Sequence, residues 1–311
     1  MPPRKLRISA LVGATATGKT AVGEWLAARL GATILCADSR QLFRELSIGT
    51  GKPTRAEMLR QPHALFDLLS VGEHPAAGEY SRAAAAKALS VSASGGELLF
   101  VGGSGLYLRA LIHGLSAQPP RDPALRERLG EELSHNGTPV LHERLMRLDP
   151  QRAGELQPTD TQRVIRALEI IESSGRTTAW WRAQPSTPVI EAEWRIVELT
   201  MPGPELNERV EVRTAEMFAT GLVEETLALI EAGREAELAR LRAVGYDEAI
   251  ELVHGRMSRG EAEARTSLRT RQLAKRQRTW FRHQLEAVRL SASGGTVEAV
   301  GAMAIVALEH P

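Results

Sequence analysis

The chain has 311 residues, and its 39 Lys and Arg against 38 Asp and Glu give a formal net charge of +1 at pH 7. This length predicts about two domains with a large buried core, and the near-neutral charge excludes a wholly basic coat but not a local basic groove. The single cysteine, Cys36, excludes an intrachain disulfide, the scattered histidines lack metal-ligand spacing, and no signal peptide or membrane span is evident, so we expect a cytoplasmic protein.

The first hundred residues alternate short apolar runs with helical patterns. We expect strands at 6–12, 33–37 and 98–101, and helices at 19–30 and 81–92. Such an alternation predicts an α/β fold in which helices cover a parallel sheet, with ligands at the carboxyl ends of the strands. Gly13, Asp38 and Gly102 each follow a predicted strand, so we expect them to meet in one crevice.

A phosphate-loop motif, GATATGKT, joins the first strand to the first helix. It consists of Gly13, Ala14, Thr15, Ala16, Thr17, Gly18, Lys19 and Thr20. Loop amides and the helix N-terminus favour an anion, Lys19 adds positive charge, and the Thr20 hydroxyl can bind Mg²⁺. The alternative is a chance match in a glycine- and alanine-rich turn. Because strand, loop and helix follow in the required order, the motif predicts a P-loop NTPase-like sheet that binds a diphosphate or polyphosphate.

Polar residues follow the next two long strands. Asp38 is placed to act as a general base or a metal ligand, and its alternative role is an ordinary helix N-cap. After strand 98–101, a typical phosphate-loop ATPase would place an Asp for Mg²⁺, but here Gly102-Gly103-Ser104 follows. Paired glycines allow a ligand to approach the backbone and Ser104 offers a hydroxyl, so we expect this loop to anchor an oxygen-rich group.

Beyond Gly114 the sequence predicts a helical insertion over about residues 115–190. Helical patterns cover 123–135, 140–148 and 160–174, the last ending at Gly175. Gln162, Arg163 and Arg166 share one helical face. A second basic group, near the start of the insertion, consists of Arg121, Arg126 and Arg128.

The chain is then expected to return to the core through a strand at 195–199. Helical patterns follow over 204–285 with breaks near Gly233, Gly245 and Gly255, and we expect a closing strand at 292–299 and a helix at 300–308. Arg209 and Arg213 lie four residues apart on one helix, where one of them could bind a diphosphate. Ion pairing with Glu205 and Glu216 is the alternative.

A basic helix is predicted at 265–282, where seven Lys or Arg and no acid occur. Arg271, Lys275, Arg278 and Arg282 fall on one stripe, while the apolar Leu273 and Trp280 fall on another side. A solvated surface helix would account for this run alone. Together with the two basic groups of the insertion, however, it favours a long polyanion such as RNA.

Several motifs, in order along nearly the whole chain, closely resemble the tRNA dimethylallyltransferases of bacterial type. They are GATATGKT, Asp38-Ser-Arg-Gln, Ile48-Gly-Thr-Gly-Lys-Pro53, Pro62-His63, Val101-Gly-Gly-Ser-Gly-Leu-Tyr-Leu108, Val244-Gly-Tyr246 and Thr270-Arg-Gln-Leu-Ala-Lys-Arg-Gln277. The resemblance implies transfer of a dimethylallyl group from dimethylallyl diphosphate to N6 of adenine 37, next to the tRNA anticodon. The phosphate loop would then bind the leaving diphosphate and not ATP.

The resemblance also implies roles for individual residues. Asp38, Ser104 and Arg213 would be catalytic, Gly13–Thr20 would bind diphosphate, and Thr20 would hold Mg²⁺ as the cofactor. The implied tRNA contacts are Asp38, Ser39, Arg40, Gln41, Ser104, Arg126, Gln162, Arg163, Val164, Ile165, Arg166, Lys275, Arg276, Gln277 and Arg278. We expect a catalytic core of residues 1–114 and 195–311, an insertion of residues 115–194 that contacts the anticodon stem-loop, no membrane partner, and a monomer.

Departures from the family pattern are few: Ser104 replaces Thr, Phe43 replaces Tyr and Gly51 replaces Ala. Only the Phe43 change removes a polar group, so no hydrogen-bonding role is expected there. Three alternatives remain: an isopentenyltransferase acting on free adenine nucleotide, a small-molecule kinase, and a non-catalytic RNA-binding protein switched by nucleotide. The insertion and the basic helix argue against the first, and the phosphate loop is the only support for the second.

Overall fold

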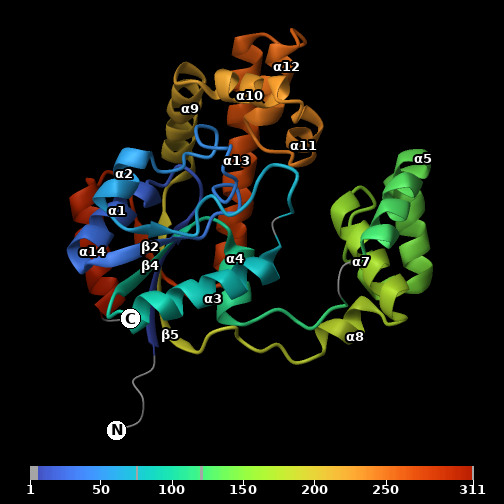
Figure 1. The fold of residues 1–311 in the computed structure, drawn as a ribbon, viewed down its shortest axis with the longest axis horizontal. Helices are drawn as coiled ribbons and strands as arrows, with labels where there is room; N and C mark the ends of the chain where they lie inside the picture. Colours follow the sequence, from blue (N-terminus) through green and yellow to red (C-terminus); the bar gives the residue numbers. More distant parts are fainter. Residues whose placement is uncertain (1–5, 75, 120–121, 310–311) are drawn as a thin grey trace. The chain divides into compact units, whose positions relative to one another are not determined.

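The computed structural model describes residues 6–74, 76–119 and 122–309, which form two compact units. One unit comprises Met1–Ile112 and Val189–Pro311, and the other comprises His113–Pro188 (Figure 1). The sequence predicts a return to the core at residue 195. The earlier return is explained by Ile190, which is 5% exposed and packs in the core beneath the sheet.

The first unit is built on a parallel sheet with the strand order β3-β2-β4-β1-β5-β6 among the described residues. The strands are β1 (Leu6–Gly13), β2 (Ala32–Cys36), β3 (His63–Ala64), β4 (Glu97–Gly102), β5 (Ala192–Thr200) and β6 (Val288–Ser291). In register, Val12 of β1 lies opposite Gly102 of β4, and Cys36 of β2 lies opposite Val101. The strand ends that carry the phosphate loop, Asp38 and Ser104 therefore lie at the same edge of the sheet.

Both faces of this sheet are buried, because successive side chains of a strand point to opposite sides. Ile8, Ala10 and Val12 pack on one face with helices α3 (Ala77–Ala93) and α4 (Gly105–Ile112). On the other face, Leu11 packs with α1 (Lys19–Leu30) and α14 (Val297–Glu309), which lie together at one side of the unit in Figure 1. The helices thus cover the sheet as the α/β prediction requires.

A third hydrophobic cluster lies beyond the carboxyl edge of the sheet. It joins Phe43 and Leu46 to a group of helices. The helices between β5 and β6 are α9 (Gly203–Ala219), α10 (Leu222–Glu231), α11 (Glu235–Arg240), α12 (Tyr246–Val253) and α13 (Arg259–Gln284), and the short α2 (Arg55–Arg60) precedes β3. Helix α13 is long enough to take part in all three clusters: Ala262 packs in the third, Ala274 packs with Leu11 on one face of the sheet, and Phe281 packs on the other face.

The second unit is helical throughout its described elements. These are α5 (Pro123–Leu148), α6 (Pro150–Gly154), α7 (Thr161–Ser174) and α8 (Thr178–Arg182). The two predicted helices at 123–135 and 140–148 form α5, which is interrupted at Gly137, where φ is +75°. Asp160 caps α7 by accepting from Arg163 N, and Gly175 ends it in the left-handed conformation, as the sequence predicts.

One predicted element is wrong. The closing strand is Val288–Ser291 and not 292–299, and α14 already begins at Val297. The buried Ala292 is flanked by Ser and Gly residues, and this weak alternation resembles the pattern of a strand. In the structure Ala292 lies just past the end of β6, where its N–H donates to Thr200 O. No described helix is both long and apolar enough to span a membrane.

Candidate active site

The phosphate loop leaves β1 at Gly13 and closes on the carbonyl of Ala14. A Cβ at Gly13 would lie 2.7 Å from Leu199 O, so only glycine fits at this position. Thr17 Oγ1 donates to Ala14 O at 2.9 Å. Gly18, with φ of +85°, begins α1 in a conformation that side chains rarely adopt, and it directs the first helical turn toward the loop.

Lys19 lies folded over this loop with 9% of its surface exposed, and its Nζ donates to Ala14 O at 3.3 Å. Burial lowers the pKa of Lys19 to about 8 because it penalises the charged amine; Asp38 opposes this shift and Arg213 adds to it. A negative ligand at the loop would favour the charged amine. Burial therefore disfavours the charged Lys19 amine in the free protein, and a bound anion would offset this cost.

Asp38 and Ser104 meet across the ends of β2 and β4. Ser104 Oγ accepts from Ser39 N at 2.8 Å and donates to Ser39 Oγ at 3.1 Å. Asp38 Oδ1 accepts from Arg40 N at 2.9 Å, which forms a turn. No helix begins at Asp38 within the described chain, so the N-cap alternative is wrong. The turn holds the carboxylate through Oδ1.

The two arginines of α9 have different partners. Arg209 pairs with Glu205 at 3.3 Å and its side chain is 42% exposed. Arg213 instead donates to Thr15 Oγ1 of the phosphate loop and to Thr50 O, each at 3.3 Å. Burial lowers the pKa of Arg213, and the charge of Asp38, which lines the same cavity, opposes that shift. The geometry therefore favours Arg213 over Arg209 as the diphosphate contact.

Two cavities border this group. One of about 680 Å³ is lined by Asp38, Ser104 and apolar side chains such as Trp280, and another of about 650 Å³ is lined by Lys19, Thr20 and Arg209. Arg213 lines both. We call the cavity at Asp38 the carboxylate cavity and the cavity at Lys19 the phosphate-loop cavity. Ligands in the two cavities would thus meet at Arg213.

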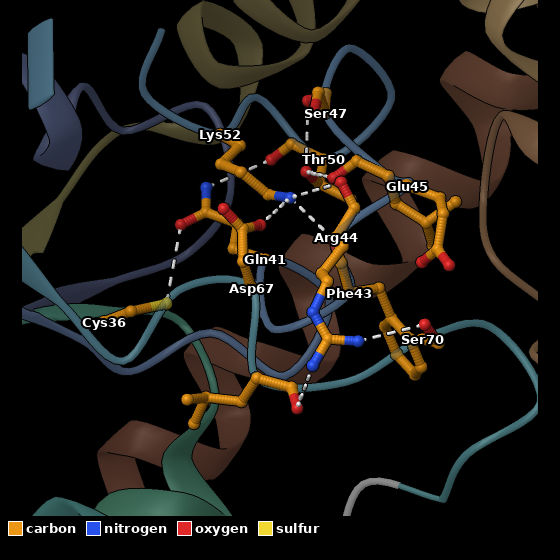
Figure 2. Close-up of polar contacts among 12 residues, drawn as sticks. Cys36, Gln41, Phe43, Arg44, Glu45, Ser47, Thr50, Lys52, Asp67 and Ser70 are labelled. Carbon is orange, nitrogen blue, oxygen red and sulfur yellow. Dashed lines mark hydrogen bonds and ion pairs between the residues drawn. The ribbon is translucent and has the colours of Figure 1, made fainter. Parts of the chain in front are cut away.

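The loop from Asp38 to Pro53 is held by a buried lysine (Figure 2). Lys52 Nζ donates to Phe43 O at 2.5 Å and to Asp67 Oδ1 at 2.6 Å, and its side chain is 4% exposed. Gln41 Nε2 donates to Thr50 O at 3.2 Å, the same carbonyl that accepts from Arg213. The loop therefore places the carbonyl that orients Arg213.

Two of the departures lie in this loop. Phe43 is fully buried in the third cluster, where a ring without a hydroxyl packs well. Gly51 has φ of +59°, and a Cβ there would lie 2.2 Å from Arg213 Nη2. Glycine thus allows Arg213 to lie directly on the loop.

The glycines at the end of β4 and just after it make close packing contacts. A Cβ at Gly102 would lie 2.1 Å from Ala37 O, and one at Gly105 would lie 2.0 Å from the ring of Trp280. A Cβ at Gly103 would lie 2.5 Å from Gln277 Nε2. These glycines admit the neighbouring strand end and helix α13, and Gly103 and Gly105 also line a cavity, so the approach of a ligand to this backbone stays a prediction.

The other predicted tRNA contacts of the first unit are not equally accessible. Lys275 and Arg276 are exposed on α13 and Arg278 is half-buried. Arg40 is half-buried and donates from Nη2 to Leu241 O at 2.8 Å, and burial lowers its pKa. Gln277 is turned inward to the phosphate loop, where it accepts from Thr15 N at 2.8 Å.

In the second unit, Gln162 and Arg163 are exposed on α7 and Arg126 is half-buried on α5. Arg166 pairs with the buried Glu169 at 3.1 Å. Val164 and Ile165 pack in or against the core of this unit, with Val164 fully buried, so their side chains hold the helix in place. Arg121 lies outside the described residues, and Arg128 pairs with Glu172 at 2.6 Å.

A metal site made by the protein alone is absent from the described residues, which contain no group of three His, Cys, Asp or Glu suited to an ion. Thr20 is exposed at the start of α1 and lines the phosphate-loop cavity together with Glu205 and Glu208. These oxygen donors suit a hard cation such as Mg²⁺ that is held mainly by a phosphate ligand.

Sequence reasoning overlooked the residues that support the site from behind. The sequence indicated no role for Thr50 and Lys52, which lie in the Ile48–Pro53 motif, or for Asp67. Their partners lie far away in sequence or are backbone carbonyls, which no sequence pattern reveals. The inward direction of Gln277 was also not foreseen. Its signal was the position three residues before Trp280, on the apolar side of an otherwise basic helix.

The chain is similar to a family of known proteins. The family model described as IPP transferase matches residues 41–284. The chain is 42% identical over 278 residues to a tRNA dimethylallyltransferase of Anaeromyxobacter sp. (strain Fw109-5), covering 89% of this chain and 92% of the relative, and 43% identical over 277 residues to one of Synechococcus sp. (strain CC9311), covering 89% and 86%. The crystal structure of a tRNA isopentenylpyrophosphate transferase from Bacillus halodurans matches with a TM-score of 0.68 and 29% identity, over 98% of this chain and 97% of that one.

Proposed function

The chain belongs to the IPP transferase family and is a tRNA-modifying prenyltransferase, and from this premise we propose the reaction and the residues that perform it. The donor is dimethylallyl diphosphate, and the acceptor is N6 of adenine 37 in tRNA. The C–O bond between the prenyl C1 and the diphosphate breaks, and its electron pair leaves with the diphosphate. A bond forms between C1 and N6, and N6 loses one proton.

The phosphate loop stabilises the leaving diphosphate. Breaking an allylic C–O bond places negative charge on the diphosphate, and Lys19 lies folded over the loop at the phosphate-loop cavity. Arg213 reaches the same loop through Thr15, and its planar group is suited to two parallel bonds with phosphate oxygens. Lys19 is buried and Arg213 is half-buried, and removal from water strengthens the interaction of such cations with the developing charge.

Asp38 receives the N6 proton. Its carboxylate lines the 680 Å³ cavity, which is large enough for a purine, and Arg40 N fixes one oxygen by hydrogen bonding. Ser104 keeps the segment after Asp38 in place through Ser39. The base has to leave the anticodon loop to enter the cavity, which costs a few kcal/mol and less for an unpaired base.

Mg²⁺ fits the phosphate-loop cavity, since Thr20 and nearby carboxylates supply oxygen donors there. Thr20 would hold the ion, which when bound supplies charge that favours the departure of diphosphate. Lys19 and Arg213 continue to bind and orient the diphosphate itself.

Exposed and half-buried polar side chains of both units bind the tRNA backbone. We assign this role to Lys275, Arg276 and Arg278 on α13 and to Gln162, Arg163 and Arg126 of the second unit, which thus serves as the tRNA-contacting insertion. All residues of the reaction centre lie in one unit of one chain, so we propose that the enzyme acts as a monomer. Sedimentation of the free protein measures this directly.

The observation that carries the proposal is Arg213, which contacts the phosphate loop, lines one cavity together with Asp38 and also lines the cavity at Lys19. The test is incubation with radiolabelled dimethylallyl diphosphate, Mg²⁺ and an anticodon stem-loop. Label is expected on a stem-loop with adenine 37 and not on one with guanine 37. Labelled AMP or ATP, with unlabelled RNA, would instead identify an enzyme of free nucleotides, and release of ADP from ATP would identify a kinase.

A further inference from the structure

Gln277 joins two loops that are far apart along the chain. Its Oε1 accepts from Thr15 N of the phosphate loop at 2.8 Å, and its Nε2 donates to Gly103 O after β4 at 3.0 Å. These partners lie 262 and 174 residues away in sequence. One neutral side chain thus joins the loops that follow β1 and β4.

The loop after β4 is shaped to receive this side chain. A Cβ at Gly103 would lie 2.5 Å from Gln277 Nε2, and one at Gly105 would lie 2.0 Å from Trp280. Gln277 and Trp280 are three residues apart and share a face of α13. Two glycines therefore give this one face of the helix access to the loop, which distinguishes it from the exposed basic face that carries Lys275.

Thr15 links Gln277 to the reaction centre. The Thr15 amide is held by Gln277, and the Thr15 hydroxyl accepts from Arg213 Nη1 at 3.3 Å. If Gln277 were lost, the Thr15 backbone would be free to turn and Arg213 would lose a defined partner. Because the glutamine amide is neutral, it fixes the loop without adding negative charge beside the diphosphate.

We infer that Gln277 is a positioning residue for the diphosphate site and not a contact to tRNA. It holds the phosphate loop and Gly103 in place, and Arg213 is oriented through Thr15. This inference rests on the proposed function, in which the loop binds the leaving diphosphate.

The test compares Gln277→Met, which keeps the volume and removes both hydrogen bonds, with Gln277→Glu, which keeps only the acceptor for Thr15 N. Gln284→Met, at the exposed end of the same helix, is the matched control. Calorimetry with inorganic pyrophosphate and Mg²⁺ measures the diphosphate site, and fluorescence anisotropy with the anticodon stem-loop measures RNA binding. Steady-state transfer gives kcat and the KM for the donor.

For Gln277→Met we expect pyrophosphate affinity to fall by at least about tenfold, the size expected for two lost hydrogen bonds, with stem-loop affinity unchanged within about twofold. The KM for the donor rises and kcat falls. Gln277→Glu weakens pyrophosphate binding as well, through charge repulsion, and Gln284→Met changes nothing.

Retained pyrophosphate affinity with a loss of stem-loop affinity would assign Gln277 to tRNA and overturn the inference. Tighter pyrophosphate binding would overturn it too, because Gln277 would then occupy the phosphate position as a plug. If Gln277→Met does not fold, Gly103→Ala displaces the side chain by its Cβ and is expected to give the same pattern. If the wild type transfers no label to the stem-loop, the proposed function fails, while the pyrophosphate comparison still decides the role of Gln277.

Discussion

Asp38 owes its position to its own turn, in which one carboxylate oxygen accepts from Arg40 N. Asp38→Asn keeps an oxygen for this bond and removes the ability to take a proton. We expect kcat for prenyl transfer to fall by about 10²–10⁴-fold, as for the loss of a general base, with stem-loop affinity within about twofold of the wild type. Rapid-quench transfer and anisotropy measure the two quantities. An equal loss of both would show that Asp38 contacts RNA and does not act as the base.

Lys19 makes the free enzyme less stable at neutral pH than at alkaline pH. The pKa of Lys19 is about 8 in the folded protein against its ordinary value of 10.5, so the unfolded chain binds more protons between these pH values. The free energy of unfolding attributable to Lys19 is therefore lowest below pH 8 and rises between pH 8 and 10.5. From pH 7 to 9.5 the expected rise is about 2 kcal/mol.

Urea unfolding of metal-free wild type and Lys19→Met at the two pH values measures this contribution. The methionine variant lacks the amine, so the difference in its unfolding free energy between pH 7 and 9.5 is smaller by that amount, while its transfer activity is lost. Asp38 and Arg213, the charged groups that act on the Lys19 amine, are the same in both proteins. Identical pH dependence in the two proteins would contradict a lowered Lys19 pKa.

At the scale of elements, the strands and helices that could be predicted are those marked by apolar periodicity or by capping residues in the sequence. The strands β1, β2, β4 and β5 and the helices α1 and α7 lie where expected, because apolar alternation and capping residues such as Asp160 are local signals. The closing strand was misplaced because Val288–Ser291 is a short edge strand with largely exposed side chains, so no alternation marks it.

The site shows the same division. The phosphate loop and Asp38 could be assigned because they follow strands directly. The support of Arg213 by Thr50 could not, because it depends on a carbonyl whose direction is set by the loop and not by any side-chain type. Likewise, a basic stripe indicated the outer face of α13, whereas the inward contact of Gln277 depends on the packing of that helix against Gly103.

Lys52 supports the loop whose Thr50 carbonyl accepts a hydrogen bond from Arg213. Lys52→Met removes a buried ammonium group that donates to Phe43 O and Asp67, so we expect a loss of about 1–3 kcal/mol in the free energy of unfolding. Lys52 holds Phe43 O in the same loop as Thr50, whose carbonyl accepts from Arg213, so we expect kcat also to fall for the folded variant. Denaturant unfolding and transfer kinetics below the transition measure both.

The control for Lys52 is Lys87→Met, an exposed lysine of α3, which is expected to change neither quantity. Asp67→Asn should cost less than Lys52→Met, since the Asp67 side chain is 47% exposed and can be partly replaced by water. If Lys52→Met loses stability and keeps the wild-type kcat, the lysine only supports folding and Arg213 is oriented independently of this loop.

At the scale of the whole molecule, the two units have separate cores. The insertion packs α5 and α7 around Leu129 and Leu168, while the reaction centre lies within the other unit. The charges proposed for tRNA are divided between them, so a net charge of +1 is compatible with a strong polyanion ligand. Contributions from cations in separate units, without shared partners, are expected to add.

This additivity leads to a prediction about salt. Arg163 in the insertion and Lys275 on α13 are exposed, and each is proposed to neutralise one phosphate. Each single alanine variant should therefore weaken stem-loop binding at low salt and reduce the slope of log K against log salt by about 0.7–0.9, and the double variant should lose the sum. Arg271→Ala is the control on the same helix, because Arg271 pairs with Glu211 at 2.7 Å and should change the slope less than Lys275→Ala. A slope unaffected by Arg163→Ala but reduced by Lys275→Ala would confine tRNA binding to the catalytic unit, since a cation that contacts no phosphate releases no counterion.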